Sequence, residues 1–421
     1  MRNKIAGILI ICMLAGCLLS GCKGDENIKD SSSKKETMTE KSEPQGLFFE
    51  DGKLMQGDKE FYGVGVNYYD MFTGCFYKKW DLTDTMNALE VLDSYGCKVV
   101  RFATLPFYGE DMGYYLNVED TYWSKLDQLV EKCEELGIGL IPSLFWRLSF
   151  FDYYGEVYEE SIFNDESQGM KFMRDYTEKF VKRYAHSPAI YGWEFSNERI
   201  LSSDIPGRQL EDVYYTLNGV NRLYTVFSEI VAENDPYNRM IATGDTMPRA
   251  SQYNQWKYGN WTGDTMDQHL QVLEKMHPLE MNSMSLHAYS LRSLLSPKDQ
   301  VGAYFEADTW KELFEHMQNV SSTLSKACYV GECGYALNAD MDFNSVTKED
   351  LQECYDAIVD AAYDTNMQLI LLWNYDPTST LEGEALYGRG SGVEYSWNEN
   401  MPWGQIALES MKKLNDKWNS K

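Results

Sequence analysis

Short apolar runs alternate with longer amphipathic stretches along the chain from residue 60 onward. The short runs are rich in β-branched and aromatic residues and are bounded by turn residues, which favours strands. Eight such runs occur, and we predict one strand in each. The predicted strands are Phe61–Val66, Lys98–Phe102, Gly139–Ser143, Ile190–Phe195, Met240–Thr243, Ser283–His287, Ala327–Glu332 and Gln368–Trp373.

The stretches between these runs carry apolar residues at helical spacing and end at residues that stop helices. Strands that alternate with helices eight times predict a (β/α)8 TIM barrel, an α/β fold in which a single domain spans residues 47–421. The clearest predicted helices are Asp84–Tyr95, Leu126–Leu136, Glu211–Glu233 and a closing helix, Ile406–Trp418.

A doubly wound open sheet is the alternative architecture. It would carry a Gly-rich phosphate-binding turn between its first strand and its first helix. The segment Gly63-Val64-Gly65-Val66-Asn67 lacks the third glycine and the helix start of such a turn. The barrel is therefore favoured, and its chemistry is expected at the carboxyl ends of the strands.

The first 22 residues have the pattern of a bacterial export signal. A basic start is followed by the uncharged stretch Ile5–Leu19, and Leu19–Cys22 then matches a lipobox, in which the Cys thiol is acylated after cleavage. An earlier box ends at Cys17, but the polar residues after Cys22 favour the later site. The alternative is an uncleaved anchor, because the uncharged stretch approaches the ~18 residues of a spanning helix.

Residues 23–46 are rich in Ser, Lys, Glu and Asp, with almost nothing to bury. This composition predicts a disordered polar tether between the lipid and the domain. We therefore expect a protein held on the outer face of the bacterial cell membrane by its lipid alone, or secreted.

The overall charge narrows the class of ligand. Asp plus Glu number 65 against 38 Lys plus Arg, which gives a formal charge of −27. Such a chain repels phosphate backbones, so nucleic-acid binding is not expected. The 30 Tyr and 11 Trp residues supply aromatic faces that suit neutral, ring-shaped ligands. We expect a monomer.

Cysteine usage gives no sign of a metal site. The six cysteines beyond the tether form no CxxC pair and accompany no cluster of His, so neither a metal nor another cofactor is predicted. An even number outside the cell permits disulfides, although Cys97, Cys133 and Cys328 lie in apolar segments typical of buried free thiols. The six are Cys75, Cys97, Cys133, Cys328, Cys333 and Cys354.

Two carboxylates follow predicted strands. Asn197-Glu198 comes after the fourth strand, and Glu332 ends the seventh. Strands four and seven lie across a barrel from each other, so their ends direct both carboxyls into one cleft. Such a pair suits glycoside cleavage, in which one carboxyl protonates the leaving oxygen and the other attacks the anomeric carbon. A separation of about 5–5.5 Å would indicate a retaining enzyme.

The pattern resembles the clan A retaining glycosidases, and most of all glycoside hydrolase family 5, the cellulase and mannanase family. The resemblance covers the chain from about residue 60 to 415. It implies that Glu198 is the acid/base and Glu332 the nucleophile, with Asn197 on the sugar 2-hydroxyl. Its most specific elements are Asn197-Glu198, His287-x-Tyr289, Glu332 and Trp373.

Further binding roles follow from the same resemblance. Arg101 and Tyr289 would hold and polarise the nucleophile. His287 would line the sugar site next to the cleaved bond, and Trp373 would form the stacking floor beneath it. Trp146, after the third strand, is a candidate second stacking surface.

The implied activity is hydrolysis of a β-linked polysaccharide, as an endo-β-1,4-mannanase or a β-1,4-glucanase. Many family members place a His or two Asn residues at the end of strand three, where this chain has Ser143-Leu144-Phe145-Trp146. That departure weakens any transfer of substrate preference. Two alternatives remain open: an exo-acting β-glycosidase of the same clan, and a non-catalytic glycan-binding lipoprotein, which would not need paired carboxylates.

Overall fold

The computed structural model describes most of the chain. All the described residues belong to one compact unit, Glu43–Lys421. The predicted signal and tether lie outside the described residues apart from Gly46, and so does the start of the predicted helix Glu211–Glu233. The described residues are 46–206, 214–289, 307, 309–335, 346–381, 386, 388–390 and 393–421.

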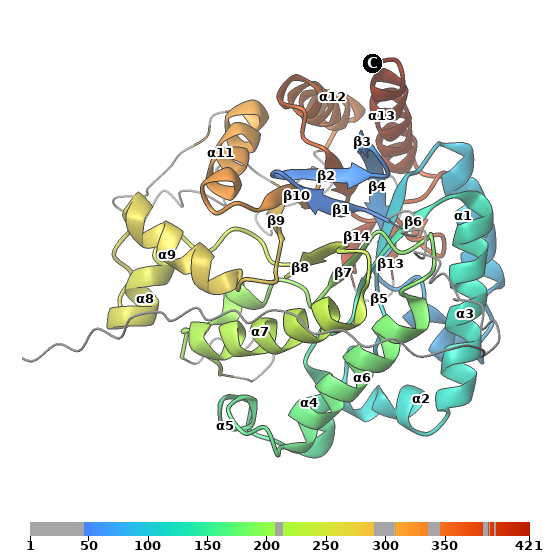
Figure 1. Cartoon of the computed structure of the whole chain (residues 1–421). Coiled ribbons are helices and arrows are strands. Elements are labelled where there is room, and N and C mark those ends of the chain that lie inside the picture. The colour runs from blue at the N-terminus through green and yellow to red at the C-terminus, as the bar shows by residue number, and fades with distance from the viewer. Residues whose placement is uncertain are drawn as a thin grey trace, which may run out of the picture. The chain divides into compact units, whose positions relative to one another are not determined.

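Eight parallel strands close into a barrel, which confirms the predicted fold and all eight predicted strands (Figure 1). The ring runs β4-β5-β6-β7-β8-β9-β10-β11 and closes by pairing β11 with β4. The strands are β4 Gly63–Asn67, β5 Val99–Ala103, β6 Gly139–Ser143, β7 Gly192–Glu194, β8 Met240–Ala242, β9 Ser283–Ala288, β10 Ala327–Cys333 and β11 Leu369–Leu372.

Helices surround the strands in Figure 1. The four helices predicted above are present as α1, α3, α7 and α13. The longer helices are α1 Thr83–Ser94, α3 Glu119–Leu136, α6 Gln168–Tyr184, α7 Leu217–Asn234, α9 Met266–Met276, α11 Trp310–Thr323, α12 Lys348–Thr365 and α13 Pro402–Asn419. Short helices are η1 Thr73–Lys78, η2 Gly109–Met112, α2 Gly113–Leu116, α4 Ser149–Tyr154, α5 Tyr158–Ile162, η3 Arg199–Ser202 and α8 Gln252–Tyr258.

Local sequence fixes where several helices begin. Thr265, Thr309 and Thr347 each cap a helix. In each case the Thr side chain accepts the N–H of the third helical residue, and the side chain of that residue accepts the N–H of the Thr. This capping box satisfies amide groups that have no partner within the helix. Helix α3 begins seven residues before the predicted start, at Glu119, because acidic residues in the first turn favour a helix N-terminus.

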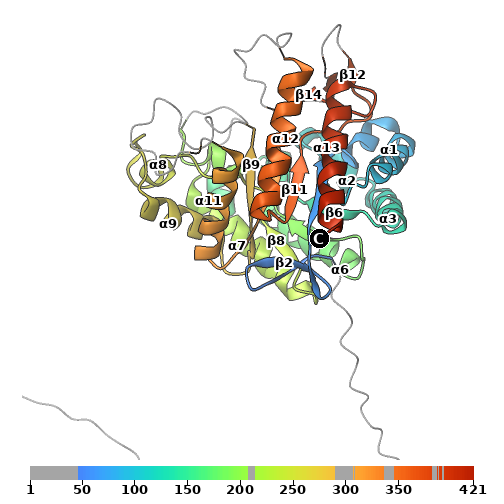
Figure 2. The same cartoon turned by 90° about the horizontal axis from the view of Figure 1, so that it is seen from above.

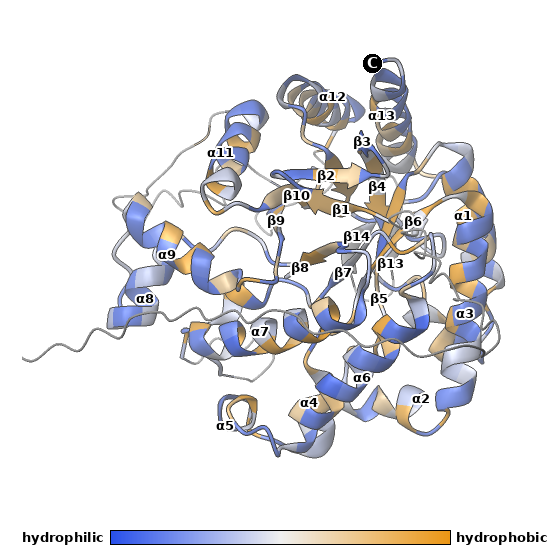
Figure 3. Cartoon of the chain, in the orientation of Figure 1, coloured by the Kyte–Doolittle hydropathy of each residue, from blue (hydrophilic) through white to orange (hydrophobic). Residues whose placement is uncertain are grey.

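The apolar residues form two layers. One fills the barrel, where Val99, Ile141, Tyr329 and Leu371 are buried together. The other lies between the strands and the helices. Figure 3 shows the same division, with hydrophobic strands in the centre and hydrophilic outer faces on the helices.

A small antiparallel sheet, not predicted above, covers the amino-terminal end of the barrel. It consists of β1 Phe48–Glu50, β2 Lys53–Gln56 and β3 Lys59–Glu60. Leu47 joins it to the barrel, because its N–H donates to Tyr191 and its carbonyl accepts from Met240. A second small sheet, β12 Thr380–Leu381, β13 Gly388–Gly390 and β14 Val393–Ser396, follows β11 at the opposite end (Figure 2).

No disulfide joins the six cysteines beyond the tether. Cys97 and Cys133 are buried, as expected for thiols in apolar segments, and Cys328 is half-buried. Within the part of the chain that the structure describes, no helix has both the length and the apolar content needed to cross a membrane.

Candidate active site

Glu332 lies near the carboxyl end of β10 and is buried, with 3% of its side chain exposed. The pairing of β10 with β9 shifts register between Val330 and Glu332. Such an irregularity re-aims a side chain. Gly331 permits it, because a Cβ there would lie 2.8 Å from Nε2 of His287. The local backbone therefore directs Glu332 toward the neighbouring strand ends.

Two hydrogen bonds hold the Glu332 carboxylate. Nη1 of Arg101, on β5, donates to Oε1 of Glu332 at 2.7 Å. The Tyr289 hydroxyl donates to Oε2. These are the two contacts expected for a nucleophile that must stay ionised and oriented.

Arg101 is completely buried, and its guanidinium connects four strands. Its Nε donates to both oxygens of Glu194, at 2.8 and 2.9 Å. Nη1 also donates to Asn67 at 2.9 Å, and Nη2 donates to Asn197 Oδ1 at 2.8 Å. Burial opposes the charge of Arg101, but Glu194 and Glu332 outweigh it and raise its pKa above the ordinary value.

Glu198 follows β7 and has a left-handed backbone, with φ 51°. Its side chain is 29% exposed, whereas that of Glu332 is nearly inaccessible. Nδ1 of His287 lies 3.0 Å from Oε1 of Glu198 and 3.4 Å from Oε1 of Glu332. His287 therefore sits between the two carboxylates, and Glu198 is the one open to solvent and to a leaving group.

The spacing of the carboxylates is short. One oxygen of Glu198, one of Glu332 and a ring nitrogen of His287 all lie within 4.8 Å of one another. Retaining glycosidases hold their carboxyl groups about 5–5.5 Å apart, and inverting enzymes about 6.5–9.5 Å apart. The close approach of these oxygens is in keeping with the shorter, retaining spacing.

Burial and nearby charges shift the pKa values of Glu332 and His287 in opposite directions. Burial raises the pKa of Glu332, as does the charge of Glu198, while His287, Arg101 and Tyr289 act in the opposite direction. Burial lowers the pKa of His287 to about 4, so this ring is neutral near pH 7. Arg101 is then the cation that faces the nucleophile.

The trio of Glu198, His287 and Glu332 has the donor types of a metal site. However, Arg101 already places a positive charge 2.7 Å from Glu332, which disfavours a cation there. Glycoside cleavage by two carboxyls needs no metal. The paired carboxylates therefore do not require a metal to account for their arrangement.

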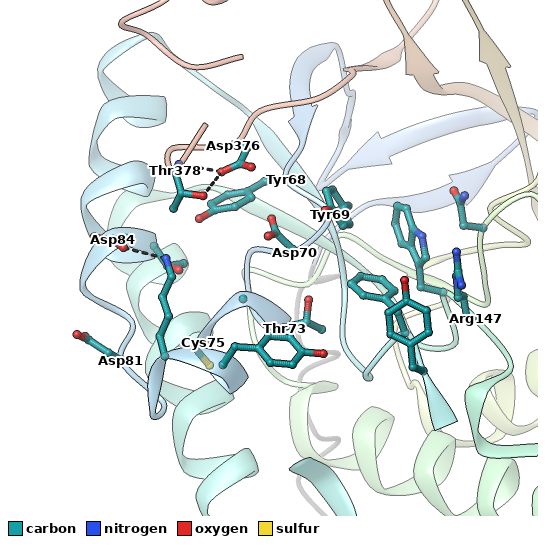
Figure 4. Close-up of a pocket in the computed structure, with 18 of the residues that line it drawn as sticks. Tyr68, Tyr69, Asp70, Thr73, Cys75, Asp81, Asp84, Arg147, Asp376 and Thr378 are labelled. Carbon is teal, nitrogen blue, oxygen red and sulfur yellow. Dashed lines mark hydrogen bonds and ion pairs between the residues drawn. The ribbon is translucent and has the colours of Figure 1, made fainter. Parts of the chain in front are cut away.

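A cleft of about 530 Å³ lies beside this centre, lined in part by η1 (Figure 4), and neither Glu198 nor Glu332 is among its lining residues. Asn197, Trp373 and Trp146 line its inner end, and exposed Tyr77 and Tyr108 lie on its rim. Its walls carry four Asp, one Lys and one Arg. These charged residues are Asp70, Asp81, Asp84, Asp376, Lys78 and Arg147.

The aromatic residues at the inner end pack against one another. The ring centroid of Trp373 lies 6.0 Å from Tyr69 and 6.3 Å from Trp146, both in stacked orientation. The Arg101 guanidinium lies over the Trp146 ring, 4.5 Å from its centroid. Trp146, predicted as a stacking surface for sugar, is thus 7% exposed and also supports Arg101.

Hydrogen bonds, ion pairs and a cation–π contact connect seven of the eight predicted site residues around Arg101, and Trp373 joins them through Trp146. Cys22 lies outside the described residues. Glu194 and Asn67 were given no role above, although both bind Arg101. The available signal was a charged residue inside an apolar strand, Trp193-Glu194-Phe195, which must find a buried partner.

Comparison with known proteins agrees with this geometry. The model of the family described as "Cellulase (glycosyl hydrolase family 5)" matches residues 58–379. Among curated proteins, none matches the chain significantly.

Solved structures share the fold at low sequence identity. An endo-1,4-β-mannanase from Rhizomucor miehei is 16% identical, with a TM-score of 0.60 over 89% of this chain and 100% of the other. An endo-β-1,4-mannanase from Thermotoga petrophila is 17% identical, with a TM-score of 0.55 over 86% of this chain and 78% of the other. A family 5 mannosidase from Rhizomucor miehei is 13% identical, with a TM-score of 0.61 over 90% of this chain and 100% of the other.

Proposed function

The chain belongs to glycoside hydrolase family 5, and from that premise we propose that it is a retaining, endo-acting hydrolase of β-1,4-linked polysaccharide, with mannan the first candidate and glucan the second. The observation that carries the proposal is the pair Glu198 and Glu332, with oxygens within 4.8 Å of each other. The mannan preference is supported by the fold neighbours, which are described as mannanases and mannosidases.

In the proposed mechanism each carboxyl has one role in the first step. Glu332 attacks the anomeric carbon, which forms a bond from sugar to enzyme as the glycosidic C–O bond breaks. Glu198 donates its proton to the departing oxygen, so the leaving sugar departs neutral. Arg101 and Tyr289 keep the attacking carboxylate ionised and aimed.

The second step reverses these roles. A water molecule enters on the side of Glu198. Glu198 removes a proton from this water as the water oxygen attacks the anomeric carbon. The bond to Glu332 breaks, and the sugar is released with its original configuration. His287, neutral near pH 7, is hydrogen-bonded to Glu198 through both steps.

The charge of the cleft favours a neutral glycan. Its walls carry four Asp against one Lys and one Arg, and Lys78 is paired with Asp84 at 3.0 Å. A uronic acid or another anionic substituent would meet an excess of carboxylates. Linear mannan and glucan bring hydroxyls for these carboxylates and apolar ring faces for the aromatic residues.

A substrate panel tests the proposal. Wild-type protein should release reducing ends from linear β-1,4-mannan, or failing that from β-1,4-glucan, and lower the viscosity of the solution early in the reaction. Proton NMR should show products with the β configuration first. Release of monosaccharide without loss of viscosity would favour the exo-acting alternative, and glycan binding without turnover would favour a binding protein.

We also propose that the mature protein begins at Cys22 and is anchored by lipid on the outer face of the bacterial cell membrane. The support is the sequence Leu19–Cys22 after an uncharged stretch, followed by a polar segment. One acyl chain gives only marginal membrane binding, so two or more are expected. A polysaccharide too large to enter the cell would then be cut at its surface.

A further inference from the structure

The segment that carries Glu198 is held by the chain that follows β8. The Ser196 N–H donates to the Thr243 carbonyl at 3.0 Å, and the Glu198 N–H donates to the Gly244 carbonyl at 3.1 Å. Glu198 has a left-handed backbone, which is strained for a residue with a side chain and persists only when its surroundings hold it. The end of β8 is therefore part of what places the proposed acid/base.

Asp245 is the side chain at this junction, and it is 1% exposed. Its Oδ1 accepts the N–H of Ile200 at 2.9 Å, two residues after Glu198. Its Oδ2 accepts from the Tyr224 hydroxyl on α7. The carboxyl thus ties the Glu198 segment to a helix of the outer layer.

The backbone of Asp245 is fixed as well. Its N–H donates to Oγ1 of Thr243 at 3.1 Å, and its carbonyl accepts from the Ser285 hydroxyl on β9. Gly244, with φ 75°, has no room for a side chain, because a Cβ there would lie 1.9 Å from the Ser196 carbonyl. The turn is therefore closely fitted to the strand end that precedes Glu198.

We propose that Asp245 is a positioning residue for Glu198: its buried carboxyl fixes the segment that carries the proposed acid/base. The inference rests on the proposed function, because it assigns Asp245 to the acid half of that reaction. Asp245 touches neither the nucleophile nor, in this arrangement, the reacting atoms.

Charged and titratable groups face Asp245 from several elements. Burial raises the pKa of Asp245 to about 7, and the charge of Glu198 adds to the rise. The Tyr224 hydroxyl, the Ile200 N–H and the charge of Arg199 act in the opposite direction. Because Asp245 ionises only near neutral pH, it holds the segment through its hydrogen bonds rather than through its charge.

Asp245→Asn tests this role, because the amide keeps an oxygen for the Ile200 N–H and loses the second oxygen, which accepts from the Tyr224 hydroxyl. With aryl β-glycosides of the sugar that the wild type cleaves, kcat/KM for the phenyl glycoside should fall about tenfold, a part of the effect of a general acid. The kcat/KM for the dinitrophenyl glycoside reports the first step alone and should change little, because that leaving group needs no proton.

Asp264→Asn is the matched control. Asp264 is also 1% exposed, and burial also raises its pKa. It accepts from the N–H groups of Tyr253 and Asn254 at 2.7 and 3.0 Å, which hold α8 and not the Glu198 segment. Its substitution should leave the ratio of kcat/KM for the two aryl glycosides unchanged.

Several outcomes would overturn the inference. Equal losses on both aryl glycosides in Asp245→Asn would show a general structural role, and no loss would show no role. If that variant does not fold, Tyr224→Phe takes its place, because it removes one hydrogen bond to Asp245. It should lower the rate on the phenyl glycoside and spare the dinitrophenyl glycoside. An equal loss on both substrates overturns the proposal.

The variant Glu198→Ala shows whether a negative result overturns only the role of Asp245 or the proposed function as well. If Glu198→Ala itself shows no selectivity for the leaving group, the acid/base assignment is wrong and both proposals fall. If Glu198→Ala is selective and Asp245→Asn is not, only the role of Asp245 is overturned.

Discussion

Nη1 of Arg101 lies 2.7 Å from Oε1 of Glu332, and both side chains are buried. The same guanidinium binds Glu194 through Nε, so one cation faces two carboxylates inside the barrel. A charge buried in this way is stable only with its partners in place. The proposed nucleophile is therefore oriented from the interior of the barrel.

We expect Tyr289→Phe to move the acidic limb of the pH profile to higher pH by about one unit. Burial raises the pKa of Glu332, and the Tyr289 hydroxyl lowers it. Loss of that hydroxyl raises the pKa further, so a higher pH is needed to ionise the nucleophile. The profile of kcat/KM against pH measures this, with Tyr115→Phe, whose hydroxyl binds Glu119, as the control. An unchanged limb would contradict the assignment.

Azide should distinguish the two glutamates. Glu332→Ala leaves space for the anion where the carboxylate stood, so azide should attack from that face and give a glycosyl azide of inverted configuration. Glu198→Ala still forms the covalent intermediate from dinitrophenyl glycosides, and azide should release it with retained configuration. NMR of the two products reads the outcome. The same configuration from both variants would refute the assigned roles.

Glu194→Gln should destabilise the fold by about 3–5 kcal/mol, because it leaves Arg101 buried without one of its charge partners. It also weakens the bond from the Tyr329 hydroxyl, which lies 2.9 Å from Glu194 Oε2. Urea unfolding measures the loss. Glu90→Gln breaks a surface ion pair with Lys132 and should cost less than about 1 kcal/mol. Equal costs for the two variants would exclude the buried network as a source of stability.

Tyr108→Ala should slow polymer hydrolysis about fivefold and leave aryl monosaccharide hydrolysis unchanged, because an aromatic contact contributes about 1 kcal/mol. Tyr108 lines the cleft and is 52% exposed. Tyr258, which is 67% exposed and does not line the cleft, supplies the control Tyr258→Ala. A loss on both kinds of substrate in Tyr108→Ala would place its effect at the reacting sugar.

Cys22→Ser should release the protein to the medium or leave an unprocessed precursor. The reason is that acylation requires the thiol, and the lipid supplies the proposed membrane attachment. Fractionation of cells and the mass of the mature chain measure the effect. Cys17→Ser should be processed normally. Normal membrane association of the Cys22 variant would refute the proposed anchor.

The eight barrel strands could be predicted because each is an apolar run long enough to contrast with its surroundings. The sheets β1–β3 and β12–β14 could not, since strands such as Lys59–Glu60 and Thr380–Leu381 are two residues long and polar or exposed. A strand of two residues is too short to show an alternation of apolar and polar positions. Their pairing comes from tertiary contacts, for example that of Leu47 with Tyr191.

Residues of the site differ in how much the sequence says about them. Glu198 and Glu332 were predictable because each stands at the end of an apolar strand. Asp245 was not, because its role depends on contacts with Ile200 and Tyr224, and sequence separation does not show which loops meet. Trp146 shows a third case, in which the position was predicted but the contact with Arg101 was not.

The chain enters the barrel beside Leu47, at the end opposite the carboxylates. The residues that close one end of the barrel are thus separate from those that hold Glu198 and Glu332 at the other end. A change in the strength of the closing sheet can therefore alter stability without touching the groups around the two carboxylates.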